Sequence, residues 1–129
     1  MGMLDGRVAI CTGSGRGVGA EVAKLMAANG ARVLVNDPGV AQSGEGADAT
    51  PAEQIVAEIK AAGGQAVANF GSVARYEDCL AMVAQAREAF GGLHILFNPA
   101  GILRDRMFHN LSPEDWQAVI AVHLTGHFN

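Results

Sequence analysis

The sequence has few cysteines, few aromatic residues and no long apolar run. It contains two cysteines, one tyrosine and one tryptophan in 129 residues. Cys11 and Cys79 lie far apart in apolar stretches, which excludes a disulfide-rich scaffold and favours buried free thiols in a reducing compartment. No apolar stretch approaches the roughly 18–20 residues of a membrane-spanning helix, and the N-terminus lacks the features of a signal peptide. We therefore expect a soluble, cytoplasmic protein that does not insert into a membrane.

Charge is also sparse and evenly spread. The 13 acidic and 9 basic side chains give a net charge of −4. Because Lys and Arg form no basic stripe, the sequence does not favour a nucleic-acid-binding surface. The histidines show no metal-ligand spacing with a cysteine or carboxylate partner, so we expect no metal site. The histidines are His94, His109, His123 and His127.

What the chain does have is a regular alternation of strand-like and helical segments. Half of its residues are hydrophobic, which is enough for one domain with one core. The repeated alternation predicts right-handed βαβ units on a parallel sheet, an α/β fold. The helix over 18–28 is expected to bury the face that carries Val18, Val22, Leu25 and Met26. A polar, Gly-rich stretch over 37–50 predicts a long loop, mobile or functional. The predicted strands span 7–11, 31–36, 65–69 and 93–97, and the other helices span 50–62, 76–90 and a segment that opens at 112–115.

A glycine-rich turn, TGSGRGVG over 12–19, follows the first predicted strand and opens the first helix. Such a turn can hold an anion, because the N–H groups at a helix start are unpaired and the helix dipole is positive there. A side chain at Gly13, Gly17 or Gly19 would keep a pyrophosphate away or block helix-to-strand packing. Asp37 ends the second strand about eighteen residues later, close to the spacing of about 20 for a ribose-binding carboxylate. The alternative is that both segments are plain structural turns.

These residues resemble a known family. The glycine turn, Asp37 and the segment Asn98-Pro99-Ala100-Gly101 are together similar to the short-chain dehydrogenase/reductase family along the whole chain. The stretches AGILRDRMF (100–108) and AVHLTG (121–126) resemble the hydroxyacyl-CoA dehydrogenase region of multifunctional β-oxidation enzymes. The resemblance implies a Rossmann-type parallel sheet in the order 3-2-1-4, with a nicotinamide dinucleotide bound at it.

The resemblance also implies roles for individual residues. Asp37 would hold the adenosine ribose and repel a 2′-phosphate, which favours NAD over NADP. Arg16 argues in the other direction, because NADP-dependent relatives often keep a basic residue there; a solvated turn residue is the alternative. The turn would line the pyrophosphate and its ribose, the segment after the third strand would flank the adenine, and the segment after the fourth would pass beneath the nicotinamide ribose. The implied cofactor-binding residues are Gly13, Arg16, Gly17, Val18, Gly19, Asp37, Ser72, Val73, Asn98, Ala100 and Gly101.

Three positions depart from the family pattern. Pro99 replaces the second Asn of Asn-Asn-Ala-Gly and so removes a backbone donor and a side-chain contact. Ser72 stands where many members have an Asp that binds the adenine amino group. His123 occupies the position of the active-site Asn, which makes it a candidate catalytic residue; a packing residue on the last helix is the alternative.

The catalytic Ser and Tyr-x3-Lys of the family are absent. The one tyrosine, Tyr76, is followed four residues later by Leu80. We therefore interpret residues 1–129 as a single partial dinucleotide-binding domain, truncated before strands five to seven and inactive alone. The family reaction would be NAD-linked oxidation or reduction at a secondary alcohol or ketone, such as a 3-hydroxyacyl thioester; the alternative is a non-catalytic nucleotide-binding or assembly module. The exposed fourth strand and last helix predict a homo-oligomer, with strand or helix exchange.

Overall fold

The computed structural model of the chain describes residues 2–39 and 50–129, and within them four strands form one parallel sheet. The strand order is β3-β2-β1-β4, so the expected α/β architecture and strand order are confirmed. Residues 40–49, most of the predicted loop over 37–50, lie outside the described part. The strands are β1 (Val8–Cys11), β2 (Arg32–Asn36), β3 (Gln65–Asn69) and β4 (Ile95–Phe97).

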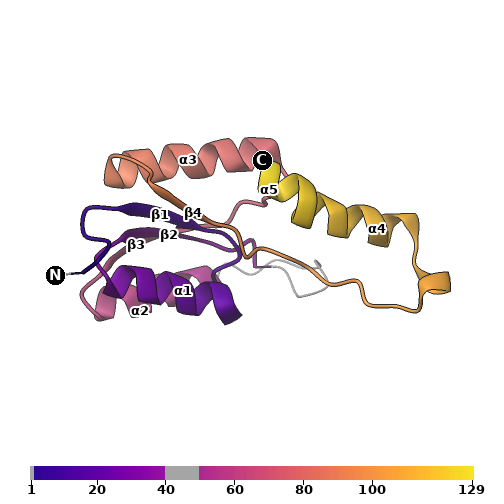
Figure 1. Cartoon of the computed structure of the whole chain (residues 1–129), viewed down its shortest axis with the longest axis horizontal. Coiled ribbons are helices and arrows are strands. Elements are labelled where there is room, and N and C mark those ends of the chain that lie inside the picture. Colours follow the sequence, from indigo (N-terminus) through magenta and orange to yellow (C-terminus); the bar gives the residue numbers. More distant parts are fainter. Residues whose placement is uncertain (1, 40–49) are drawn as a thin grey trace.

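Helices cover both faces of the sheet (Figure 1). α1 (Gly17–Ala28) and α2 (Thr50–Ala61) lie on one face, and α3 (Tyr76–Phe90) lies on the other. The central strands β1 and β2 are therefore buried on both sides, which explains their nearly continuous apolar sequence. After a 3-10 turn (Phe108–Asn110), the chain ends in α4 (Pro113–Ile120), a π-helical turn (Ala121–Thr125) and α5 (Gly126–Phe128). In Figure 1, α4 extends beyond the carboxyl ends of the strands.

The buried face of α1 matches the predicted one only in part. Val18 is 72% exposed and Leu25 is also exposed, whereas Val22 and Met26 are half-buried and Met26 packs against the core. The fully buried residues of the helix are the small ones. Small side chains let the helix axis approach the sheet closely, and the space is filled from the strands and from α2. The apolar periodicity identified the helix correctly but did not distinguish its alanine stripe from its valine and leucine stripe. The buried residues are Gly19, Ala20, Ala23 and Ala27.

Strand β4 is shorter than predicted and forms an edge of the described sheet. The strand begins at Ile95. At the residue before it, His94, the backbone N–H of Val8 bonds to the histidine side chain and not to a backbone carbonyl. Val8 N donates to His94 Nδ1 at 2.9 Å, and His94 N donates to Val8 O at 2.9 Å. Among the described strands β4 pairs only with β1, and Leu96 on it is 57% exposed. The expected exposed edge is therefore present.

The last helical segment starts where the sequence indicates and carries an exposed apolar stripe. Ser112 Oγ accepts from Asp115 N at 3.0 Å, and Asp115 Oδ2 accepts from Ser112 N at 3.2 Å, which is a capping box. Further along, Trp116, Leu124 and Phe128 are exposed and follow one another at helical spacing. No helix in the described ranges is long and apolar enough to cross a membrane.

Candidate functional site

The carboxyl ends of the strands open onto a cavity of about 620 Å³. The start of α1, the loop after β4 and the inner side of α4 enclose it. This is the position at which open parallel sheets bind ligands. The lining residues are Gly13, Arg16 and Gly17 from the glycine turn, Asn36, Asp37 and Pro38 after β2, Ser72, Val73 and Ala74 after β3, Pro99, Ala100, Gly101, Ile102 and Arg104 after β4, and Ala118, Ala121 and Val122 from the last helix.

Most of the residues expected to bind a cofactor line this cavity, although three do not. Val18 points into solvent on α1, Gly19 is buried beneath the turn, and Asn98 lies outside the lining. The sequence therefore predicted which segments meet at the cavity. Which residues of each segment point into the cavity depends on the backbone conformation, which the sequence pattern did not give. The residues that do line the cavity are Gly13, Arg16, Gly17, Asp37, Ser72, Val73, Ala100 and Gly101.

Two glycines of the turn are required for different physical reasons. Gly17 has φ +57°, in the left-handed region that favours glycine, and a Cβ built there would meet no atom within 4 Å. A Cβ at Gly19 would overlap the carbonyl oxygen of Gly13, on the preceding turn. Gly17 therefore sets the backbone direction and leaves space at the cavity, whereas Gly19 allows α1 to pack against the turn.

In the part of the chain that the structure describes, the N-cap side chain does not cap the start of α1. Arg16 is the N-cap residue and makes no side-chain capping hydrogen bond, and the first turn contains no acidic residue. The positive end of the helix dipole and its first N–H groups are thus available to an external anion. Because Arg16 and Gly17 both line the cavity, this end of α1 is suited to a phosphate group.

Asp37 holds the glycine turn to the end of β2. Its Oδ2 accepts from Gly15 N at 3.1 Å, and its Oδ1 accepts from Gly39 N at 2.7 Å. The side chain is almost fully buried and still lines the cavity. Each carboxylate oxygen accepts more than one hydrogen bond, so the group retains acceptor capacity for ligand hydroxyls.

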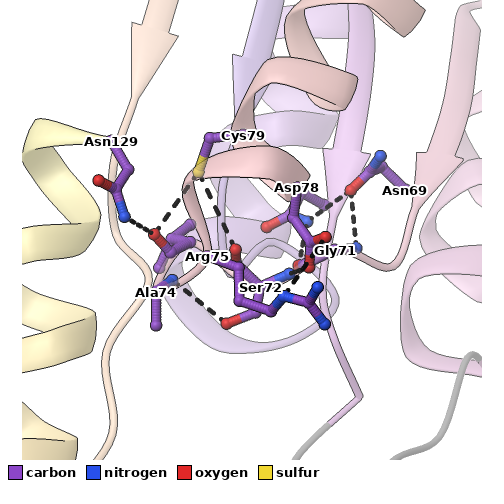
Figure 2. Close-up of polar contacts among 10 residues, drawn as sticks. Asn69, Gly71, Ser72, Ala74, Arg75, Asp78, Cys79 and Asn129 are labelled. Carbon is purple, nitrogen blue, oxygen red and sulfur yellow. Dashed lines mark hydrogen bonds and ion pairs between the residues drawn. The ribbon is translucent and has the colours of Figure 1, made fainter.

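The corner after β3 fixes Ser72 through a polar network (Figure 2). Ser72 N donates to Asp78 Oδ2 at 2.9 Å, and Ser72 Oγ accepts from Ala74 N at 3.2 Å. The neighbouring Val73 carbonyl accepts from Asn129 Nδ2 at 2.9 Å, which ties this corner to the residue that follows α5. The Ser72 hydroxyl therefore has a fixed place on the cavity wall and keeps its own proton to donate.

Sequence reasoning missed Asn36, which is fully buried at the end of β2. Asn36 Nδ2 donates to Asn69 Oδ1 at 2.9 Å and to Gly71 O at 2.9 Å, and Asn69 Nδ2 donates to Gln85 Oε1 at 2.9 Å. Burying an amide is costly without such bonds. The network joins the ends of β2 and β3 and so sets the spacing of the two walls. The signal in the sequence that could have identified Asn36 is its position as a polar residue at the end of an apolar strand.

His123 lies against the loop after β4 and does not line the cavity. Its Nε2 is 3.1 Å from Ile102 N and 2.9 Å from Ile102 O, and the tautomer decides which of the two it bonds. A Cβ on Gly101 would lie 2.5 Å from His123 Cε1, so the ring packs directly on that glycine. The contact sits in the π-helical turn, a feature frequent at functional sites. His123 therefore positions the loop, and its catalytic role stays a prediction.

Thr12 also secures the loop that contains Pro99. Thr12 N donates to Phe97 O at 3.0 Å, and Thr12 Oγ1 accepts from Ala100 N at 3.4 Å. The backbone on both sides of Pro99 is thus held, although the proline itself donates no hydrogen bond.

The two cysteines are free and buried, as expected. Burial raises the pKa of the Cys11 thiol to about 12 and also raises the pKa of Cys79. Neither is therefore a reactive thiolate at neutral pH. The described residues include no group of three or more His, Cys, Asp or Glu side chains arranged to hold a metal ion.

Comparisons with known proteins agree with this geometry. The family model described as short chain dehydrogenase matches residues 7–129. The peroxisomal multifunctional enzyme type 2 of Drosophila melanogaster is 49% identical over 124 residues, which is 96% of this chain and 20% of that enzyme. A hydroxyacyl-CoA dehydrogenase of Mycobacterium tuberculosis is 44% identical over 97% of this chain and 38% of its own length.

The crystal structure of a short chain dehydrogenase from Mycobacterium avium is similar with a TM-score of 0.88 and 51% sequence identity, over 98% of this chain and 44% of that one. The chain thus spans less than half the length of each of these relatives. Members of the matched family are oxidoreductases that use nicotinamide dinucleotides. The match over residues 7–129 together with these relatives shows that the chain belongs to the short-chain dehydrogenase family.

Proposed function

We propose that this chain binds NAD(H) across the carboxyl ends of its sheet and forms the cofactor-binding part of an oxidoreductase. The observation that carries the proposal is that one cavity brings together the glycine-rich start of α1 and the buried carboxylate of Asp37. A dinucleotide needs both groups, an anion site for its pyrophosphate and an acceptor for its ribose hydroxyls.

The lining residues fit the cofactor in the order in which they occur along the sheet. Ser72 and Val73 would contact the adenine and Asp37 its ribose. The turn with Gly13, Arg16 and Gly17 would hold the pyrophosphate, with Val18 and Gly19 supporting the helix start. Asn98, Ala100 and Gly101 would lie beneath the nicotinamide ribose. When bound, the nicotinamide accepts or donates a hydride.

NAD(H) is preferred to NADP(H) because of charge. A 2′-phosphate on the adenosine ribose would face the almost fully buried Asp37 carboxylate, and like charges repel. Arg16 also lines the cavity and would attract a phosphate. The Asp37 carboxylate is nevertheless the group at the end of β2, where the ribose is bound in this fold.

The substrate that we propose is a secondary alcohol or ketone of the 3-hydroxyacyl thioester type. The support is the sequence identity that the chain shares with a hydroxyacyl-CoA dehydrogenase and with a peroxisomal multifunctional enzyme.

Proton transfer at the substrate oxygen needs a positioned acid or base, and Tyr76, exposed on α3, does not line the cavity. We propose that these 129 residues alone do not turn over substrate. The alternative is a nucleotide-binding or assembly module; free buried cysteines support a cytoplasmic location for either.

Calorimetric titration of the purified chain with NADH, and separately with NADPH, tests the cofactor proposal. We expect saturable NADH binding and weaker NADPH binding. In a separate assay with NAD and a secondary alcohol, we expect the chain alone to form no NADH. Failure of both nucleotides to bind would refute the cofactor proposal. NADH production by the chain alone would refute the claim that its residues are insufficient for turnover.

We expect the chain to form a dimer or larger oligomer in solution. The β4 edge presents unpaired backbone groups beside exposed Leu96, and the last helix exposes Trp116, Leu124 and Phe128. Exposed strand edges and apolar stripes of this kind pair with another chain. Light scattering measures the mass, and Leu96→Lys, which charges the edge, is expected to lower it. A monomeric mass over a wide concentration range would contradict the expectation.

A further inference from the structure

Besides Arg16 and Asp37, a third charged group, Arg104, lines the cavity. Arg104 lies in the loop between β4 and α4, and Asp37 lies at the end of β2. Strand β1 separates β2 from β4 in the sheet. An elongated ligand that follows the carboxyl ends of the strands from Asp37 therefore reaches Arg104 only after passing the glycine turn and the loop after β4.

Arg104 is held in place by an ionised carboxylate. Its Nη1 is 3.3 Å from Asp115 Oδ1, and the side chains of Arg104 and Asp115 are 18% and 7% exposed. The hydrogen bond from Ser112 N keeps the pKa of Asp115 below its usual value, and the nearby Arg106 guanidinium lowers it further. Because the guanidinium is already oriented, little side-chain freedom would be lost when it binds a ligand.

The cluster is not electrically neutral. Arg106 Nε also contacts Asp115, at 2.9 Å from Oδ2, so one carboxylate faces two guanidinium groups. A guanidinium carries five N–H donors, and the buried Nε of Arg104 has no acceptor among the described residues. Asp37 is the one carboxylate in the described lining. The Arg104–Asp115–Arg106 cluster therefore carries one net positive charge, and Arg104 is its member that lines the cavity.

The surroundings of Arg104 strengthen an interaction with an anion. The lining beside it is apolar, from Ile102, Ala118, Ala121 and Val122. Apolar walls lower the local dielectric constant, and hydrogen bonds to a charged group become stronger there. Guanidinium groups bind carboxylate and phosphate with two parallel hydrogen bonds. The same apolar residues offer a surface for an acyl chain.

We propose that Arg104 binds the anionic group of the substrate, a phosphate or a carboxylate, and so selects charged acyl substrates over neutral ones. The inference rests on the proposed function, because it assigns the cavity beyond Gly101 to the substrate. Arg104 acts here as a binding residue that determines specificity. Asp115 positions it.

The test is a calorimetric titration of the chain, saturated with NADH, with three probes. Acetoacetyl-coenzyme A carries phosphates, acetoacetate carries a carboxylate, and methyl acetoacetate is neutral. We expect Arg104→Gln to weaken binding of the anion that this site recognises by about tenfold or more, the usual value of a charge-assisted hydrogen bond. Affinity for NADH and for the neutral ester is expected to stay unchanged. The probe that responds identifies the source of the anion.

Arg106→Gln is the matched control, because Arg106 contacts the same carboxylate but does not line the cavity. Its affinity for the anionic probe is expected to remain near that of the unmodified chain. Equal losses in both variants, or no binding of either anion to the unmodified chain, would overturn the proposal. If Arg104→Gln fails to fold by circular dichroism, Arg104→Lys replaces it. Lysine keeps the charge but loses the planar fork, so weaker anion binding supports the proposal and unchanged binding overturns it.

Titrations with and without NADH distinguish a failure of the Arg104 assignment from a failure of the cofactor proposal. A chain that does not bind NADH refutes the cofactor proposal, and the three probes are then titrated without nucleotide. Anion binding that Arg104→Gln weakens would still support the assignment of Arg104, and its absence would overturn it.

Discussion

Asp37→Ala is expected to weaken NADH binding by about ten- to a hundredfold, which corresponds to about 1.4–2.8 kcal/mol of binding free energy. The substitution removes the acceptor for the ribose hydroxyls. It also leaves Gly15 N and Gly39 N without the carboxylate that holds them at 3.1 and 2.7 Å, so the glycine turn loses its attachment to β2. Calorimetric titration measures the affinity, and thermal unfolding shows whether the fold is retained.

Asp37→Asn separates charge from shape. The amide keeps an acceptor oxygen but has no negative charge, so NADPH affinity is expected to rise relative to NADH affinity. Asp105→Ala is the control, because Asp105 is exposed on the loop before α4 and does not line the cavity. An Asp37→Ala chain that binds NADH as tightly as the unmodified chain would show that the carboxylate supports the turn without contacting the cofactor.

Gly19→Ala is expected to destabilise the fold by about 1–3 kcal/mol, as overpacked sites do, and to abolish NADH binding. The added Cβ would overlap the carbonyl oxygen of Gly13, and the nearest atoms all belong to the backbone of Gly13 and Ser14, so no flexible side chain can move away. α1 must therefore shift away from the turn, and its first N–H groups leave the phosphate position. Chemical denaturation measures the free energy of unfolding, and calorimetry measures binding.

Val18→Ala is the matched control in the same helical turn. Val18 is exposed and lies outside the cavity lining, so the expected change in unfolding free energy is within about 0.5 kcal/mol. Comparable losses in the two variants would mean that the whole first turn of α1 is sensitive, and the steric explanation for Gly19 would fail.

Local sequence patterns predicted most of the fold. Apolar runs identified the strands, and Ser112-Pro113 and the glycine pairs identified where helices begin or end, because these signals act over a few residues. The exceptions have physical causes. Strand β4 starts late because a histidine side chain, His94 Nδ1, accepts from Val8 N, and that bond joins residues far apart in the sequence. The predicted face of α1 is only partly right, because Met26 packs against the core but Val18 and Leu25 are exposed. Alanine contributes little to an apolar count yet permits the closest packing.

The sequence also predicted part of the candidate site. The glycine turn and Asp37 were found because their spacing reflects a defined chemistry, a phosphate at a helix start and a carboxylate at the next strand end. Asn36 was missed because its Nδ2 donates to Asn69 at the end of β3 and to the Gly71 carbonyl just after it, and only the paired strands bring these residues together. Arg104 was visible only as one of several charged residues in a loop.

The sequence by itself determined the order of strands and helices along the chain, the glycine-rich turn before α1 and the acidic residue that follows β2, since each depends on neighbouring residues and backbone preferences. Only the tertiary structure decided which stripe of α1 is buried, that His123 packs on Gly101 rather than lining the cavity, and that Arg104 reaches the cavity beside Asp115. Those outcomes depend on how close separate elements approach one another. That distance is set by the packing of the whole sheet and its helices, which no short stretch of sequence specifies.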